Sequence, residues 1–364
     1  MQTQFFPSRT GAIYMGRMFL IRTIAVLAAL VLVLQALDLL GESGKILAYP
    51  GNGEAQLWEY VSMRAPQIIA RFLPFSVLLG TLVTLTTLNQ NSEIVSLKAS
   101  GLSAHQILAP LIMASLLVAI VSFIFNERIV ARATHTLTQW ERVQYGPLPK
   151  GTGVIANVWV REGNDLIHAN QIVGRGTATQ LRDVTIYDRG GGALRSIITA
   201  PEAKLATGGW QLEKAQRFDV ASGERTNIGT VIAAQGVRPD QFTLSSVDAD
   251  ALSFTELSSA IEELKAAGRP TLALESGLWH KISGPLSAML MPLLGAVAGF
   301  GLARSGQLFL RAVIGMALGF AYFVADNFAL AMGTLGAYPP LLAAWAPFLL
   351  FLMIGETVLV RTEE

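Results

Sequence analysis

Long apolar stretches occupy both ends of this 364-residue chain, and a more polar segment separates them. A helix needs about 20 mostly apolar residues to cross a bilayer. Stretches that meet this requirement are Met18–Leu40, Gln67–Asn89, Ile107–Phe125, Ile282–Ala303, Leu308–Met332 and Leu341–Leu359. The pattern therefore predicts a membrane α-helical bundle with six transmembrane helices. An even number of spans places both termini on the same side of the membrane.

Between the third and fourth stretches, the pattern changes to short runs rich in β-branched and aromatic residues, with glycine-containing turns between them. The strands we expect are Val154–Val160, Leu166–Val173, Leu181–Tyr187, Leu194–Thr199, Trp210–Val220 and Ile228–Ala234. Many short, evenly spaced strands are typical of a sandwich, a jelly roll or an open barrel. Ser253 and Glu256 then fit a capping box, which predicts a helix that leads the chain back to the membrane.

These patterns divide the chain into three parts. Residues 1–126 hold spans one to three, residues 127–276 form a β-rich domain with a return helix at 253–268, and residues 277–364 hold spans four to six. Lys and Arg are more frequent in the short loops on the side of the N-terminus. This distribution predicts cytoplasmic termini and an outer position for the β-rich domain.

The composition narrows the chemistry that this chain can perform. Charged residues make up 15% of it, against about 25% in an ordinary soluble domain. The absence of cysteine excludes disulfides and thiolate catalysis, and the four histidines form no ligand-spaced cluster. The run Gly41–Lys45 resembles a phosphate-binding loop only superficially, because Ile46 stands where a Ser or Thr must hold magnesium. We therefore expect no catalytic residue, no metal and no cofactor in this chain.

The turn between spans two and three has the pattern of a short helix. Ser92 can cap it, and Gly101 can end it. The residues between them that define the helix are Glu93, Ile94, Leu97 and Lys98. Two interpretations remain open: a solvated connector, and a helix that docks into the groove of a partner. Ser103 can cap the span that follows.

Polar side chains also occur inside the predicted spans or at their edges. They are Gln35, Asp38, Arg71, Arg311 and Asp326. Such groups are costly in lipid and usually face a cavity or a partner. For Asp38 and Asp326, a simple interfacial position remains an alternative.

Two pairs of small residues lie in spans four and five. Gly295 with Gly299, and Gly315 with Gly319, have the spacing that allows two helices to approach closely. The motif is common, so packing within the chain and contact with another subunit remain equally open.

Four runs along the chain carry a distinctive combination of residues: Ser92–Ser103, Asp248–Ser253, Trp279–Ser287 and Gly319–Asn327. Together they resemble the LptF/LptG family of lipopolysaccharide export permeases. The last two runs are more similar to the LptG branch of that family than to the LptF branch, which remains the alternative. The resemblance implies one permease half of an ABC exporter, which extracts lipopolysaccharide from the inner membrane and passes it to a periplasmic bridge toward the outer membrane.

The resemblance also implies partners and a location. The partners would be an LptF-like permease, an LptB-like ATPase dimer that binds ATP and magnesium, and an LptC/LptA-like bridge. The chain would lie in the cell inner membrane as a multi-pass protein with a jelly-roll-like periplasmic domain. The segment 92–101 would be the coupling helix, in which Glu93, Ile94, Leu97 and Lys98 contact the ATPase.

Lipid-contacting residues follow from the same resemblance. The residues implied for the lipid cavity are Gln35, Asp38, Tyr322, Phe323 and Asp326; those for head-group contact are Lys45, Arg64, Arg132 and His135; and those for gate packing are Gly315 and Gly319. Gln35 stands where some relatives carry Lys, and His135 stands where a second Arg is expected. We therefore expect a less cationic head-group site.

Two interpretations from other functional classes compete with export. A membrane sensor or scaffold would use its outer domain to bind a periplasmic ligand and would have no ATPase partner. A membrane enzyme would need an acid/base pair, for which Asp38 and Asp326 are the candidates.

Overall fold

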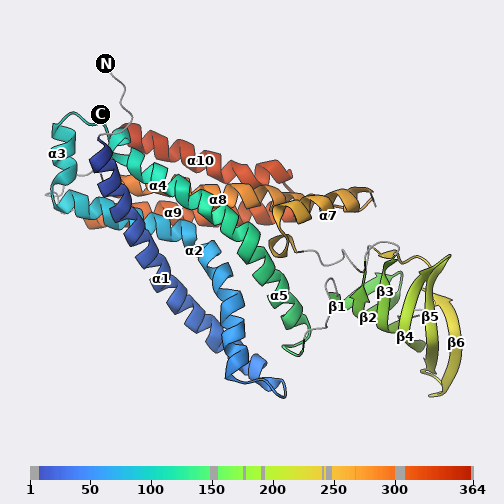
Figure 1. Cartoon of the computed structure of the whole chain (residues 1–364). Coiled ribbons are helices and arrows are strands. Elements are labelled where there is room, and N and C mark those ends of the chain that lie inside the picture. The colour runs from blue at the N-terminus through green and yellow to red at the C-terminus, as the bar shows by residue number, and fades with distance from the viewer. Residues whose placement is uncertain are drawn as a thin grey trace.

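The computed structural model describes residues 8–147, 155–174, 178–189, 193–239, 242, 248–266, 268–299 and 308–361. Long helices form a bundle, and a separate antiparallel sheet lies beyond one end of it (Figure 1). Helix α3 lies at the opposite end, together with the start of α1 and the end of α10. We call these two ends of the bundle the sheet end and the α3 end.

The bundle is built from long helices joined by short turns. They are α1 (Arg9–Ala48), α2 (Glu54–Gln90), α3 (Glu93–Ala99), α4 (Ala104–Phe125), the π-helix η1 (Asn126–Val130), α5 (Ala131–Arg142), the 3-10 helix η4 (Ala249–Ala251), α7 (Phe254–Ala266), α8 (Leu272–Gly299), α9 (Leu308–Thr334) and α10 (Pro340–Arg361). Within the described residues, five helical stretches are long and apolar enough to cross a membrane. They comprise α1, α2, α4 continued through α5, α9 and α10.

The fourth predicted span, Ile282–Ala303, is not among these five stretches. Helix α8 contains most of it, and residues 300–303 lie outside the part of the chain that the structure describes. Five of the six predicted spans are therefore confirmed as candidates, and the sixth stays a prediction.

The third span is longer than the sequence pattern suggested. The helix continues through η1 and α5 to Arg142, so the described strands begin only at Ile155. The charged residues of α5 made this segment resemble part of a soluble domain. However, its face carrying Leu137 and Trp140 is buried against Ile46 of α1 and Tyr60 of α2. Tertiary packing thus extends a helix whose composition alone is polar.

Helix ends follow local capping rules, with one exception. Ser103 Oγ accepts a hydrogen bond from Gln106 N at 3.2 Å, which confirms the predicted cap of α4. Ser253 and Glu256 form the predicted capping box of α7. Ser92, in contrast, makes no side-chain capping bond and has a left-handed backbone with φ 61°. That prediction was wrong, because the tight turn after α2 rotates the Ser92 side chain away from the start of α3.

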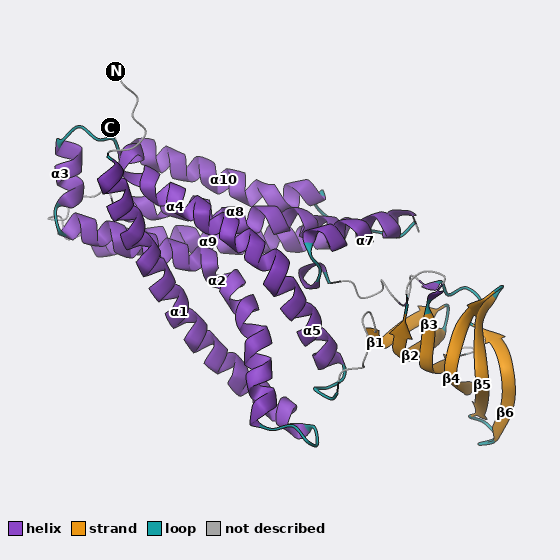
Figure 2. Ribbon diagram, in the orientation of Figure 1, coloured by secondary structure: helices purple, strands orange, loops and turns teal. Residues whose placement is uncertain are grey.

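The sheet contains β1 (Ile155–Glu162), β2 (Asp165–Val173), β3 (Gln180–Asp188), β4 (Ser196–Ala206), β5 (Gly209–Asp219) and β6 (Arg225–Ala233). Each strand pairs antiparallel with the next in sequence (Figure 2). All six predicted strands are present, although β4 extends to Ala206. One face is buried around Trp210, which packs edge-on against Phe242. Because the described strands form an up-and-down sheet rather than a Greek key, the predicted jelly-roll topology is not confirmed.

Candidate functional site

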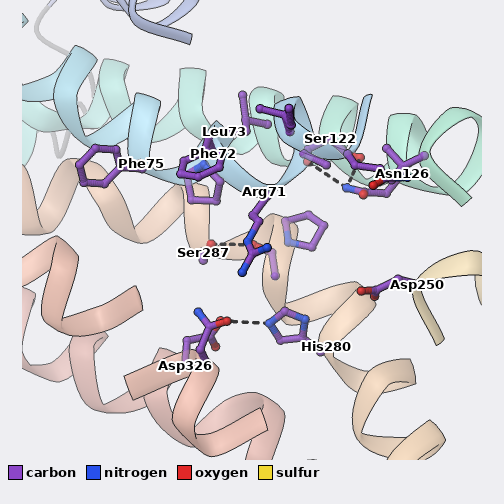
Figure 3. Close-up of a pocket in the computed structure, with 18 of the residues that line it drawn as sticks. Arg71, Phe72, Leu73, Phe75, Ser122, Asn126, Asp250, His280, Ser287 and Asp326 are labelled. Atoms are coloured by element: carbon purple, nitrogen blue, oxygen red, sulfur yellow. Dashed lines mark hydrogen bonds and ion pairs between the residues drawn. The ribbon is translucent and has the colours of Figure 1, made fainter. Parts of the chain in front are cut away.

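A cavity of about 650 Å³ is lined by residues of α1, α2, α4, η1, α5, α8 and α9, some of which are drawn in Figure 3. Most of these residues belong to the halves of the helices nearer the sheet end (Figure 1). Its lining includes four of the residues predicted for a lipid cavity, namely Asp38, Tyr322, Phe323 and Asp326. The fifth, Gln35, does not line it. Gln35 is 9% exposed, and neither of its amide atoms has a hydrogen-bond partner among the described residues.

Asp38 lies in a polar cluster between α1 and α2. Its carboxylate is 2.9 Å from Arg64 Nη2 and accepts a hydrogen bond from the Tyr60 hydroxyl at 2.6 Å. Arg64 also donates through Nη1 to Gln67 Oε1 at 2.7 Å. The carboxylate therefore neutralises the guanidinium, and the pair fastens α1 to α2.

A second polar contact, between a histidine and a carboxylate, lies on the opposite wall. His280 Nε2 of α8 is 3.0 Å from Asp326 Oδ2 of α9 (Figure 3). His280 was missed among the predicted site residues, because an isolated histidine shows no ligand spacing in the sequence. The only signal was its position within the run Trp279–Ser287. Tyr322, one helical turn from Asp326, is 3% exposed, and its hydroxyl has no hydrogen-bond partner among the described residues.

Arg71 of α2 lines the same cavity. Its guanidinium reaches toward the side of the cavity where Ser287 and His280 lie (Figure 3). The sequence indicated Arg71 as a polar group at the edge of a span, without a role. In the described part of the chain, no hydrogen bond or ion pair engages its side chain.

The other predicted head-group residues lie outside this cavity. On α5, Thr134, Leu137, Thr138 and Glu141 face the cavity, whereas Arg132 and His135 are exposed on the other side of the helix.

Lys45 lines a separate cavity near the ends of α1 and α5. Its ammonium group is 2.8 Å from Glu42 Oε1. The Tyr145 hydroxyl donates to the other oxygen of Glu42 at 3.0 Å. Burial, helped by this hydrogen bond, raises the pKa of Tyr145, so the phenol stays protonated as a donor.

Helix α3 is attached to the α3 end of the bundle by its apolar residues. Ile94 is 3% exposed and belongs to the bundle core, and Leu97 packs against that core. Val95 is 49% exposed, and Glu93 accepts hydrogen bonds from Asn91 at 3.2 Å and from the Tyr14 hydroxyl at 3.4 Å. Ile94 thus anchors α3 to the bundle core, and Val95 lies on the exposed face of the helix.

The predicted gate glycines pack within this chain. Gly315 and Gly319 are both buried in α9. A methyl group added at Gly319 would overlap the Leu78 side chain of α2, and one added at Gly295 would lie 2.7 Å from Thr81 Cγ2. The small-residue pairs could serve packing within the chain or contact with another subunit. Packing within the chain accounts for Gly295 and Gly319.

The two carboxylates considered for an acid/base pair, Asp38 and Asp326, lie on different walls of the cavity. Asp38 and Asp326 are each engaged by a partner from another helix. The described residues contain no group of three or more His, Asp or Glu side chains placed to hold a metal ion. A cavity with paired charges and apolar walls is instead suited to bind an amphipathic ligand.

A family model and individual relatives both point to the same family. Residues 13–361 match the family model described as lipopolysaccharide export system permease LptF/LptG. Lipopolysaccharide export system permease protein LptG of Escherichia coli K12 is 26% identical over 315 residues, covering 83% of this chain and 84% of the relative. The protein of the same name from Haemophilus influenzae is 24% identical over 327 residues, covering 86% of this chain and 89% of the relative.

Proposed function

Since the chain belongs to the LptF/LptG family of lipopolysaccharide export permeases, we propose that it is the LptG-type half of an ABC exporter. In this proposal, it extracts lipopolysaccharide from the outer leaflet of the inner membrane together with an LptF-like permease. An LptB-like ATPase dimer supplies the energy by ATP hydrolysis with magnesium, and this chain has no catalysis of its own. An LptC/LptA-like bridge receives the lipid.

The cavity is the observation that carries this proposal. It lies between helices that reach from one end of the bundle to the other, and its lining combines Phe72, Phe75 and Phe323 with the two polar contacts. Pockets of about 300–1,000 Å³ hold drug-sized ligands. A lipid with several acyl chains needs more space, which supports a chamber completed by a second permease.

Helix α1 supports the same assembly. It leans away from the bundle toward the sheet end (Figure 1), and the most apolar part of it is only 6% buried within the chain. Leu32 and Leu40 are 72% and 74% exposed. Such a surface suits lipid or a second transmembrane subunit. We assign it to the lateral opening that faces the partner permease.

The two ends of the bundle suit opposite sides of the membrane. With α3 and both chain ends in the cytoplasm, α3 is positioned to receive the ATPase. The sheet is then periplasmic, beyond the end of the bundle nearer the cavity, where an exported lipid would leave (Figure 1). This orientation agrees with the distribution of Lys and Arg in the short loops.

Glu93→Ala tests the coupling role. Glu93 carries the negative charge at the start of α3, and its loss is expected to weaken association with the ATPase about tenfold, because hydrogen bonds to charged groups contribute about 1.5–3 kcal/mol. The measurement is recovery of the ATPase when the tagged full-length permease is purified in detergent. Thr357→Ala is the control, because Thr357 is exposed near the same end and bonds only its own helix.

Equal recovery of the ATPase with Glu93→Ala and Thr357→Ala would remove Glu93 from the coupling role. Recovery of neither an ATPase nor a second permease with the unaltered chain would contradict export and favour the sensor or scaffold interpretation. The LptF alternative predicts that the second permease recovered is LptG-like. The names of the matched relatives favour the LptG assignment for this chain.

A further inference from the structure

Helix α2 presents two arginines to the cavity. Arg64 and Arg71 are seven residues apart, which places them on the same face of the helix about two turns from each other. They differ in what engages them. Arg64 is paired with Asp38 at 2.9 Å, whereas Arg71 has no hydrogen bond or ion pair in the described part of the chain.

The packing of α2 against α9 fixes the depth of Arg71. The two helices are in close contact where Gly319 meets Leu78. They run in opposite directions, and Arg71 lies seven residues from Leu78 toward the sheet end. Asp326 lies seven residues from Gly319 toward that same end. At 1.5 Å per residue, both side chains are therefore about 10.5 Å from the contact, on different walls of the cavity.

Two of the acids that line the cavity have a partner on another helix, and Glu141, Asp248 and Asp250 line it as well. Asp326 pairs with His280 at 3.0 Å, and Asp38 pairs with Arg64. The remaining cavity cation, Lys281, is subject to the nearby carboxylates of Asp250, Glu127 and Asp248. Among the described cavity residues, Arg71 is thus the arginine that has no ion pair with an acid.

A hydroxyl donor lies about one turn deeper than this cation. Tyr322 is three residues from Gly319, lines the cavity and is 3% exposed. Its oxygen has no hydrogen-bond partner among the described residues. A buried hydroxyl without a partner carries a desolvation cost, which a ligand oxygen would remove.

We propose that Arg71 binds an anionic oxygen group of the ligand, and that this group is a phosphate ester on the head group of the exported lipid. The Tyr322 hydroxyl provides a second donor about one turn deeper. The planar guanidinium matches phosphate oxygens with two parallel hydrogen bonds. The inference rests on the proposed export function and names the lipid chemistry recognised inside the cavity. It moves head-group recognition from the exposed Arg132 and His135 to α2.

Paired binding measurements test the site. The probes are a diphosphorylated lipid A and the same lipid after enzymatic removal of both phosphates, added to the full-length chain purified with its co-expressed partners. The unaltered protein is expected to prefer the phosphorylated form. Arg71→Gln should weaken binding of that form about tenfold or more and leave binding of the dephosphorylated form unchanged. Arg71→Lys should fall between the two, and Tyr322→Phe should have a smaller effect than Arg71→Gln.

Two control variants exclude other roles for Arg71. Asp326→Asn should keep or increase the preference for phosphate, whereas a hidden Arg71–Asp326 pair would make it behave like Arg71→Gln. Arg128→Gln, on an exposed side chain of η1 that does not line the cavity, should leave the preference unchanged. An unchanged unfolding temperature of Arg71→Gln in detergent, or partial rescue by Arg71→Lys, shows that loss of binding is not loss of fold.

Several outcomes would overturn the inference. One is an Arg71→Gln variant that retains the phosphate preference, and another is an unaltered protein that binds both lipid forms equally. Competition by inorganic phosphate at the concentration of the lipid would contradict assignment to a lipid head group. If the unaltered protein binds neither lipid, the proposed function itself fails, which distinguishes that failure from failure of the Arg71 site.

Discussion

Asp38 illustrates how single side chains keep charge inside this bundle. A carboxylate in a membrane span is costly unless another group compensates it. Asp38 receives the Tyr60 hydroxyl at 2.6 Å and the Arg64 guanidinium at 2.9 Å, and Tyr60 itself is 1% exposed. All three residues lie toward the sheet end, where α1 and α2 separate from the other helices (Figure 1). The cluster therefore holds the half of α1 nearer the sheet end in place beside the cavity.

Arg64→Gln should destabilise the protein. The variant leaves Asp38 without its cation, and because the Arg64 and Asp38 side chains are 34% and 22% exposed, we expect a loss of about 1–2 kcal/mol rather than the value for a fully buried pair. The free energy of unfolding, measured by denaturant titration in detergent, checks this expectation. Adding Asp38→Asn should recover part of the loss. An unchanged free energy in the single variant would contradict a structural role for the pair.

The sequence predicted which residues carry charge into the spans, but it did not predict their partners. Asp38 and Arg64 are 26 residues apart, and His280 and Asp326 are 46 residues apart. Each pair joins two helices whose relative rotation no local pattern determines. Arg132 and His135 show the reverse situation: the resemblance assigned them to the head group, while the rotation of α5 places both away from the cavity.

Among the helices, the contact between α2 and α9 depends on Gly319, which has no side chain to separate them. Gly319→Leu should force the two helices apart, because even a methyl group at this position would overlap Leu78. Overpacking of this kind typically costs about 1–3 kcal/mol. The unfolding temperature in detergent should therefore fall. Gly41→Ala is the matched control, since nothing lies within 4 Å of an added methyl group there, and a better helix former should leave stability equal or slightly higher.

If Gly319→Leu and Gly41→Ala unfold at the same temperature, the close contact between Gly319 of α9 and Leu78 of α2 is contradicted. The contact also sets the depth of the cavity, so the Gly319→Leu variant should bind the phosphorylated lipid differently from the unaltered chain.

Elements with a clear hydrophobic period or length could be predicted from the sequence. Elements whose extent depends on tertiary packing could not. The alternating strands and the apolar spans follow directly from period and length. Helix α5 was not predicted, because the sequence around it is polar. The helix is stabilised by burial of Leu137 and Trp140 against Ile46 and Tyr60, which no local pattern reveals. Ile94 and Leu97 similarly have the composition of a docking surface, yet they fasten α3 to its own bundle.

At the scale of the whole molecule, α3 and the cavity lie toward opposite ends of one bundle (Figure 1). Helix α3 is held rigidly at one end by Ile94 and is linked to α1 through the hydrogen bond between Glu93 and Tyr14. The cavity lies nearer the other end, and Leu34 and Asp38 of α1 line it. In the proposed exporter, movement of α3 by the ATPase would reach the wall of the cavity through α1.

The most direct test of export through this cavity is site-specific photocrosslinking in the assembled complex. A photoreactive amino acid replaces Phe323 in the cavity, and a second variant carries it at Leu350, which is 55% exposed on α10 and does not line the cavity. The account predicts that the probe at 323 captures lipopolysaccharide, that ATP addition changes the yield, and that the probe at 350 captures far less. Equal capture at both positions, or a yield at 323 that does not respond to ATP, would contradict the central claim.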